Sequence, residues 1–119
     1  MRVILVDDEE ELISALAERL SFRGIEADWA TNAEETETLV SENQYDLAVL
    51  DVKMPKTSGL DLKRILQKIA PSMKYIFLTG HGSGKDFEAG AAEAGANYYL
   101  VKPVKIEDLV EKMKEAVGK

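Results

Sequence analysis

The sequence contains no cysteine and only three prolines and eight glycines among its 119 residues. Without cysteine the chain cannot form disulfides, zinc–thiolate sites, iron–sulfur clusters or a cysteine nucleophile. Its absence is also consistent with a reducing compartment. Proline and glycine are too scarce for a collagenous or disordered chain, whereas 45% hydrophobic and 31% charged residues are typical of a globular protein.

Long hydrophobic runs are also absent. Arg2 is followed by only four apolar residues, Val3–Val6, before an acidic run begins. Such a run is too short for a signal peptide or a membrane span, so we expect a cytoplasmic protein without a membrane partner. The 22 acidic and 15 basic residues give a net charge of −7, which repels nucleic acid and anionic lipid. The length predicts one domain over residues 1–119.

Short runs rich in Val, Ile and Leu alternate with amphipathic stretches. The runs predict five strands, at Val3–Val6, Ile25–Ala30, Leu47–Leu50, Tyr75–Leu78 and Asn97–Val101. The amphipathic stretches predict helices at Glu11–Arg23, Ala33–Glu42, Gly59–Ile69 and Ile106–Val117, with a fifth in the glycine-rich segment between Gly80 and Gly95. Alternation of this kind favours an α/β fold with a parallel sheet covered by helices on both faces.

The spacing of apolar residues also predicts which helix faces are buried. In the first helix Leu12, Leu16 and Leu20 share one face, which we expect to pack on the sheet. In the third helix the apolar residues run to its last position, Ile69, and we expect that residue to point inward as well.

Charged and polar residues follow four of the predicted strands, at the point where each strand ends: Asp7, Asp8, Asp51, Thr79 and Lys102. The carboxyl ends of parallel strands meet at one edge of a sheet, so we expect these side chains to converge there. Three neighbouring carboxylates repel one another, so we expect a cation to lie among them and offset the repulsion. Oxygen ligands without histidine or cysteine favour Mg²⁺. A carboxylate between Mg²⁺ and an ammonium group is suited to accept a phosphoryl group.

Each of these signals has an ordinary explanation when it is taken alone. The acidic run from Asp7 to Glu10 could serve only to favour the start of a helix. Asp51 could belong only to a turn before Met54-Pro55, and Lys102 only to a loop before a helix. Their joint placement at the ends of different strands is what favours a phosphoryl-transfer site over coincidence.

The sequence resembles the receiver domains of two-component response regulators over essentially its whole length. Four motifs carry the resemblance: Val6-Asp7-Asp8-Glu9, Asp51-Val52-Lys53-Met54-Pro55 with Gly59, Leu78-Thr79-Gly80, and Tyr99-Leu100-Val101-Lys102-Pro103. The resemblance implies a flavodoxin-like, doubly wound sheet of five strands in the order 2-1-3-4-5 with five helices. It also implies a cis peptide bond before Pro103.

The resemblance assigns a role to each residue of the site. Asp51 would be the phosphoacceptor, and Thr79 and Lys102 would hold the phosphoryl oxygens. Mg²⁺ would be bound by Asp8, by Asp51 and by the backbone carbonyl of Lys53, with Asp7 acting through water. Tyr99 would be an aromatic switch that turns inward when Thr79 moves.

The implied function is a switch that a histidine kinase or a phosphotransfer protein phosphorylates, and not an enzyme with turnover. Its output would pass through the surface formed by the Gly80–Gly95 segment, strand Asn97–Val101 and helix Ile106–Val117. The recipient would be an effector protein or domain, as in the receiver of a transcriptional regulator, and a phosphorylation-dependent homodimer is left open. The alternative is an acidic protein-interaction module that is never phosphorylated.

Overall fold

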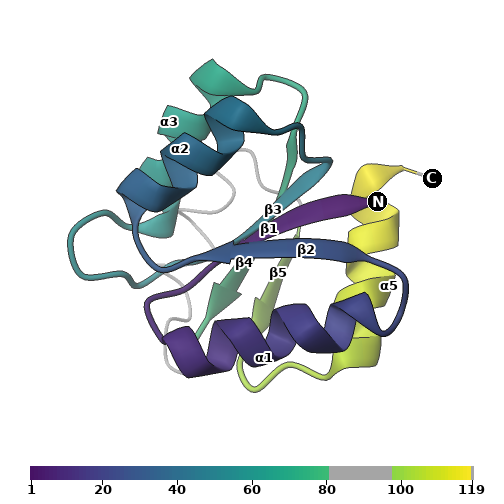
Figure 1. Ribbon diagram of the computed structural model, residues 1–119. Coiled ribbons are helices and arrows are strands. Elements are labelled where there is room, and N and C mark those ends of the chain that lie inside the picture. The colour runs from purple at the N-terminus through teal and green to yellow at the C-terminus, as the bar shows by residue number, and fades with distance from the viewer. Residues whose placement is uncertain (81–97, 119) are drawn as a thin grey trace.

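A computed structural model of the chain describes residues 1–80 and 98–118. Within them, five parallel strands form one sheet in the order β2-β1-β3-β4-β5, as predicted (Figure 1). The strands are β1 (Arg2–Val6), β2 (Glu26–Ala30), β3 (Leu47–Asp51), β4 (Lys74–Thr79) and β5 (Tyr98–Val101). The connections that the structure describes, those from β1 to β4, cross over a face of the sheet, and the parallel strand order is that of a flavodoxin-like α/β fold.

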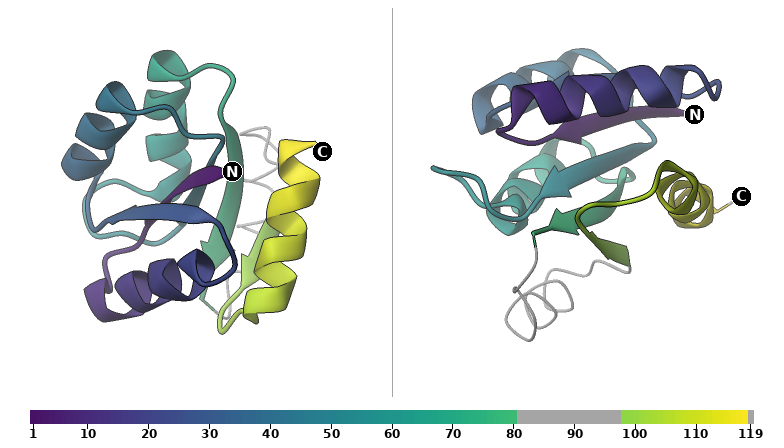
Figure 2. Two further views of the ribbon diagram at one scale, coloured as in Figure 1. Left: turned by 45° about the vertical axis from the view of Figure 1, so that its right-hand side comes forward. Right: turned by 90° about the horizontal axis from the view of Figure 1, so that it is seen from below.

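The helices that the structure describes are α1 (Glu10–Ser21), α2 (Ala33–Glu42), α3 (Gly59–Ile69) and α5 (Ile106–Val117). Figures 1 and 2 show α1 and α5 on one face of the sheet and α2 and α3 on the other. The helix expected between Gly80 and Gly95 lies, apart from Gly80, outside the described residues. The predicted bounds of α2, α3 and α5 are confirmed, and α1 ends two residues earlier than predicted.

Two of the helices begin at side chains that cap their first turn. The Asn32 side chain accepts a hydrogen bond from the backbone N–H of Glu35 at 2.8 Å. Ser58 does the same for Asp61 at 3.1 Å. Each cap satisfies one of the backbone donors that a helix leaves unpaired at its N-terminus, which explains where α2 and α3 start.

The central strands supply a core on each face of the sheet. Val3 and Leu5 point toward α1 and α5, whereas Ile4 and Val6 point toward α2 and α3. All four side chains are fully buried, because β1 lies between two other strands and under helices on both sides. This packing holds the carboxyl end of β1 in a fixed place.

Two expected core positions are wrong. Leu12 is 44% exposed, because the buried face of α1 is formed by a neighbouring set with ideal helical spacing: Ile13, Leu16, Ala17 and Leu20. Ile69 is 39% exposed, since it ends α3 and lines an open groove beside the loop that leads into β4.

Lys63 is the opposite case, a charged residue of α3 that is only 3% exposed. Its Nζ atom lies 5.1 Å from the centroid of the Tyr75 ring, so the ammonium group gains a cation–π contact as its stem packs on the sheet. Burial lowers the pKa of Lys63, and the charge of Arg64 adds to this effect.

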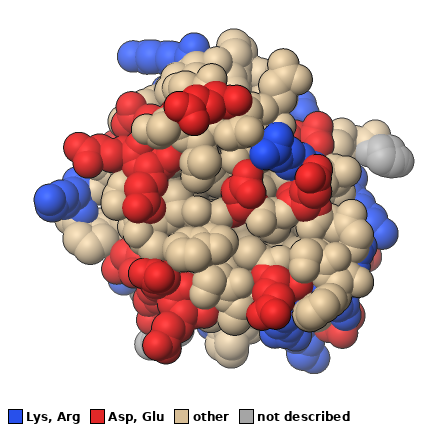
Figure 3. Space-filling view, in the orientation of Figure 1, with Lys and Arg blue, Asp and Glu red and all other residues tan. Residues whose placement is uncertain are grey.

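Carboxylates outnumber cationic side chains on the face of the molecule that carries β2, α1 and α2 (Figure 3). This surface therefore disfavours anionic partners. Among residues 1–80 and 98–118, no helix is both long and apolar enough to cross a membrane.

Candidate phosphoryl-transfer site

The register of the sheet brings the predicted acids together. Val6 of β1 pairs with Leu50 of β3, so the residues that follow them, Asp7 and Asp51, lie side by side at the carboxyl edge. Asp8 comes next on the loop that leads into α1. Carboxylate oxygens of the three aspartates all lie within 4.8 Å of one another. The predicted convergence of the three acids is confirmed.

Burial divides these acids into two kinds. Asp7 is fully buried and Asp51 is 4% exposed, whereas Asp8 is exposed. Asp7 accepts a hydrogen bond from the backbone N–H of Glu9 at 2.9 Å, which ties its carboxylate to the start of α1. Asp8 is therefore the acid that faces solvent, from which a cation would arrive.

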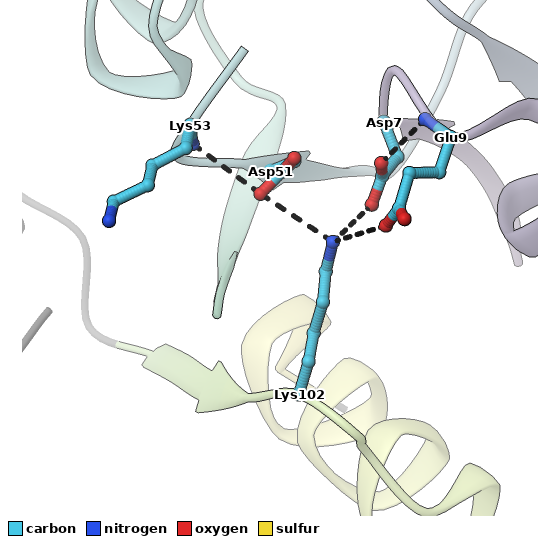
Figure 4. A network of polar contacts seen from close by, with 5 residues as sticks. All are labelled: Asp7, Glu9, Asp51, Lys53 and Lys102. Atoms are coloured by element: carbon cyan, nitrogen blue, oxygen red, sulfur yellow. Dashed lines mark hydrogen bonds and ion pairs between the residues drawn. The ribbon is translucent and has the colours of Figure 1, made fainter. Parts of the chain in front are cut away.

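Lys102 directly follows β5, the outermost strand on one side of the sheet, and its side chain extends toward the three acids (Figure 4). Its Nζ atom lies 2.6 Å from Oδ2 of Asp7 and 3.7 Å from Oδ1 of Asp51. The Lys102-Pro103 peptide bond is cis, as the resemblance implies. Burial alone would lower the pKa of Lys102, but the hydrogen bond and charge of Asp7, with Asp51 and Glu9, outweigh it and raise the pKa.

The surroundings of Asp51 shift the pKa of its carboxyl. Burial raises the pKa of the Asp51 carboxyl from 3.8 to about 6, and the nearby charges of Asp7 and Asp8 act in the same direction. Lys102 and the backbone N–H of Lys53, 3.4 Å from Oδ1, oppose the rise. Asp51 is thus a poorly solvated carboxylate that is still ionised in most molecules at neutral pH.

The other predicted site residues have separate places. Figure 4 shows the Lys53 side chain pointing away from Asp51, so this residue faces the acid only with its backbone. Thr79 ends β4 and is paired in register with Val101, next to Lys102. The Thr79 side chain lies outside the described part of the chain. Tyr99 is on β5 with 39% of its surface exposed.

Two features of the site were missed from sequence. Oε1 of Glu9 lies 3.6 Å from Nζ of Lys102, and no sequence signal links these two positions. Gly59 is packed so closely that a Cβ atom there would lie 2.5 Å from the backbone carbonyl oxygen of Asp51. The glycine belongs to the motif that follows Asp51, which is the only signal that could have indicated its contact.

A comparison with protein families matches residues 3–114 of the chain to the response regulator receiver domain. The chain belongs to this family. The receiver is 41% identical over 109 residues to the two-component response regulator PhoP of Pseudomonas aeruginosa, an alignment that covers 92% of this chain and 48% of that protein. It therefore spans about half the length of the curated relatives it matches.

Solved receiver structures have the same fold. A receiver domain from Clostridium thermocellum, 36% identical, superimposes with a TM-score of 0.88 over 98% of this chain and 93% of that one. A CheY-like receiver domain from Methanospirillum hungatei, 33% identical, superimposes with a TM-score of 0.88 over 98% of this chain and 92% of that one. The chain is thus a receiver domain of the two-component type, a class of signalling domain, with an acidic cluster that could bind a metal ion.

Proposed function

We propose that this receiver is a phosphorylation-dependent switch in which Asp51 accepts the phosphoryl group. The observation that carries the proposal is the position of its carboxylate, which is nearly buried between the acids that follow β1 and the ammonium group of Lys102. A charged carboxylate with a cation beside it and further acids to recruit a second cation is an arrangement suited to phosphoryl transfer.

The proposed donor is a phosphohistidine of a histidine kinase or a phosphotransfer protein. One oxygen of Asp51 attacks phosphorus, so that an O–P bond forms while the P–N bond to the imidazole breaks. The leaving imidazole takes up a proton. Lys102, 3.7 Å from Asp51 before the reaction, neutralises charge on the phosphoryl oxygens, and Thr79 is the proposed hydroxyl donor to the same group.

Mg²⁺ is the proposed cofactor, and the residues present fit it. The donor set is made only of oxygen atoms, and one of its three acids is exposed to solvent. Asp8, Asp51 and the backbone carbonyl of Lys53 would hold the ion, and Asp7 would act through water. When bound, the ion would offset negative charge on the transferring group.

Transmission is proposed to run from Thr79 to Tyr99. Tyr99 is 39% exposed on β5, so its side chain lies partly outside the core, and we propose that it turns inward when Thr79 moves toward the phosphoryl group. The surface around β5 and α5 would then change shape for a partner. The remainder of the proposed output surface, residues 81–97, lies outside the described residues.

The wider role follows from the relatives. They are response regulators about twice as long as this chain, so we propose that residues 1–119 form one receiver domain that acts on an effector protein or domain, as in a transcriptional regulator. A phosphorylation-dependent homodimer and a cytoplasmic location stay predictions. No direct contact with nucleic acid is proposed for this domain, because its net charge is −7.

The proposal is tested by incubation with acetyl phosphate and Mg²⁺, followed by intact-mass measurement. The wild-type chain should gain about 80 Da, the mass of one phosphoryl unit. Asp51→Asn should show no gain, whereas Asp61→Asn, which changes an exposed acid of α3, should be labelled normally. Labelling of Asp51→Asn would refute the assignment. An unlabelled wild-type chain would favour the alternative, an acidic interaction module.

A further inference from the structure

We infer that Glu9 is a positioning residue that competes with Asp51 for the ammonium group of Lys102. The inference rests on the proposed function, because the consequence of this competition is a restraint on phosphorylation. In the structure the ammonium group of Lys102 interacts with Glu9 as well as with Asp51. After phosphorylation the same ammonium group is needed by the phosphoryl group on Asp51. Release of Lys102 from Glu9 is therefore one step toward the phosphorylated state.

The distances place Lys102 between the two acids. Its Nζ atom lies 3.6 Å from Oε1 of Glu9 and 3.7 Å from Oδ1 of Asp51, so neither contact is clearly favoured (Figure 4). The firm partner of the ammonium group is Asp7, whose Oδ2 atom lies at 2.6 Å. Asp51 and Glu9 lie on different sides of Nζ (Figure 4), so Lys102 can keep its hydrogen bond to Asp7 while Nζ moves closer to one of these two acids and away from the other.

Burial decides which contact is the easier one to release. The side chain of Asp51 is 6% exposed, whereas that of Glu9 is 66% exposed. Water can solvate Glu9 as soon as Lys102 leaves it, but nothing comparable replaces Lys102 beside Asp51. Phosphorylation replaces the single negative charge of the Asp51 carboxylate with close to two on the phosphoryl oxygens, and the ammonium group should then move toward them.

Glu9 is also separate from the residues that the proposed chemistry uses. It is not one of the three acids whose oxygens cluster within 4.8 Å, and its side chain forms no cap for α1. A Glu9→Gln substitution therefore removes the competing charge and leaves Asp7, Asp8 and Asp51 in place. Glu11→Gln is the matched control, since Glu11 is an exposed acid of the same first turn without an ion pair in residues 1–80 and 98–118.

The test measures the rate of mass gain with acetyl phosphate and Mg²⁺. In this reaction an Asp51 oxygen forms the new O–P bond, the P–O bond to the acetyl group breaks, and acetate leaves. An exposed ion pair has a modest effect, so Glu9→Gln should react about two to five times faster than the wild-type chain. The rate of Glu11→Gln should lie within about 1.5-fold of the wild-type rate. At 1 M salt the difference in rate between Glu9→Gln and the wild-type chain should become smaller, because salt screens the charge of Glu9.

A second measurement reports the position of Lys102 directly. The ¹⁵N signal of the Lys102 ammonium group should shift in Glu9→Gln and not in Glu11→Gln, and beryllofluoride, a stable phosphoryl mimic, should bind Glu9→Gln about two to five times more tightly. Equal rates, equal affinities or an unmoved signal in the two variants would overturn the inference while the phosphoacceptor assignment stands. A wild-type chain that gains no mass would overturn both.

Discussion

The ammonium nitrogen of Lys102 lies 2.6 Å from Oδ2 of Asp7, although 95 residues separate the two positions. The Asp7 side chain has no exposed surface and that of Lys102 has 20%, so the pair is largely removed from water. Such a pair links the loop after β5 to the end of β1. It also gives the buried acid the cation without which its charge would be costly.

Removal of Lys102 should therefore destabilise the chain. In Lys102→Met the Asp7 carboxylate loses its cation while it stays buried, and the free energy of unfolding should fall by about 2–4 kcal/mol. Urea denaturation measures the loss. The double variant Asp7→Asn/Lys102→Met should recover part of it, because the neutral amide needs no counterion.

Arg64→Met is the matched control for that prediction. Arg64 pairs with Asp61 at 2.9 Å, but both side chains are more than half exposed. Its loss should change stability by no more than about 0.5 kcal/mol. Equal losses in Lys102→Met and Arg64→Met would show that burial of Asp7 is not what gives the Lys102 pair its importance.

The pKa of Asp51 predicts how stability depends on pH without metal. Its folded-state pKa, about 6, is above the ordinary 3.8, so the folded chain holds the proton more tightly. This contribution to stability is present below pH 4 and is lost as pH rises through 6, by about 3 kcal/mol in total. In EDTA, Asp51→Asn should gain stability relative to the wild-type chain between pH 4 and 7.5.

The same denaturation series with Glu111→Gln is the control. Glu111 is an exposed acid on α5, away from the site, and its variant should follow the wild-type curve. If the difference between Asp51→Asn and the wild-type chain does not change with pH, the environment described for Asp51 is incorrect.

Mg²⁺ should stabilise the folded chain at neutral pH. A ligand that binds only the folded state adds about 2.7 kcal/mol at a hundredfold excess over its Kd. Asp8→Ala should raise stability in EDTA, because one carboxylate leaves the cluster, and should remove most of the Mg²⁺ effect. Glu11→Ala changes an exposed acid outside the cluster, so this variant should still be stabilised by Mg²⁺ to the same extent as the wild-type chain. An undiminished Mg²⁺ response in Asp8→Ala would mean that the ion binds elsewhere.

Gly59 should tolerate no side chain. Because an alanine Cβ would lie 2.5 Å from the Asp51 carbonyl oxygen, Gly59→Ala must push α3 away from the end of β3. We expect a loss of about 1–3 kcal/mol in urea denaturation and slower phosphorylation, since Asp51 is displaced. At Gly80 no described atom lies within 4 Å of a new Cβ, so Gly80→Ala should be much closer to the wild-type chain. Similar losses in both would contradict this packing argument.

The sequence by itself determined the order and type of the described elements and the edge at which the site lies. Val3–Val6 is apolar throughout because β1 is buried on both faces, and a strand of this kind is recognisable without its neighbours. Asp7 directly follows β1, and Asp51 directly follows the apolar run Leu47–Leu50 and ends β3. Since parallel strands end at one edge of a sheet, both acids are expected at that edge, and the strand order that makes β1 and β3 neighbours was implied by the resemblance to receiver domains.

Only the tertiary structure decided which charges are buried and which are paired. Asp7 and Asp8 are adjacent in sequence, yet one is fully buried and the other exposed, because the chain turns toward α1 between them. The contact of Glu9 with Lys102 depends on how the loop after β5 folds back toward β1. Likewise, Lys63 is buried because Tyr75 lies beneath it. Burial and ion pairing depend on neighbours that are distant in the chain, and a local sequence pattern does not contain them.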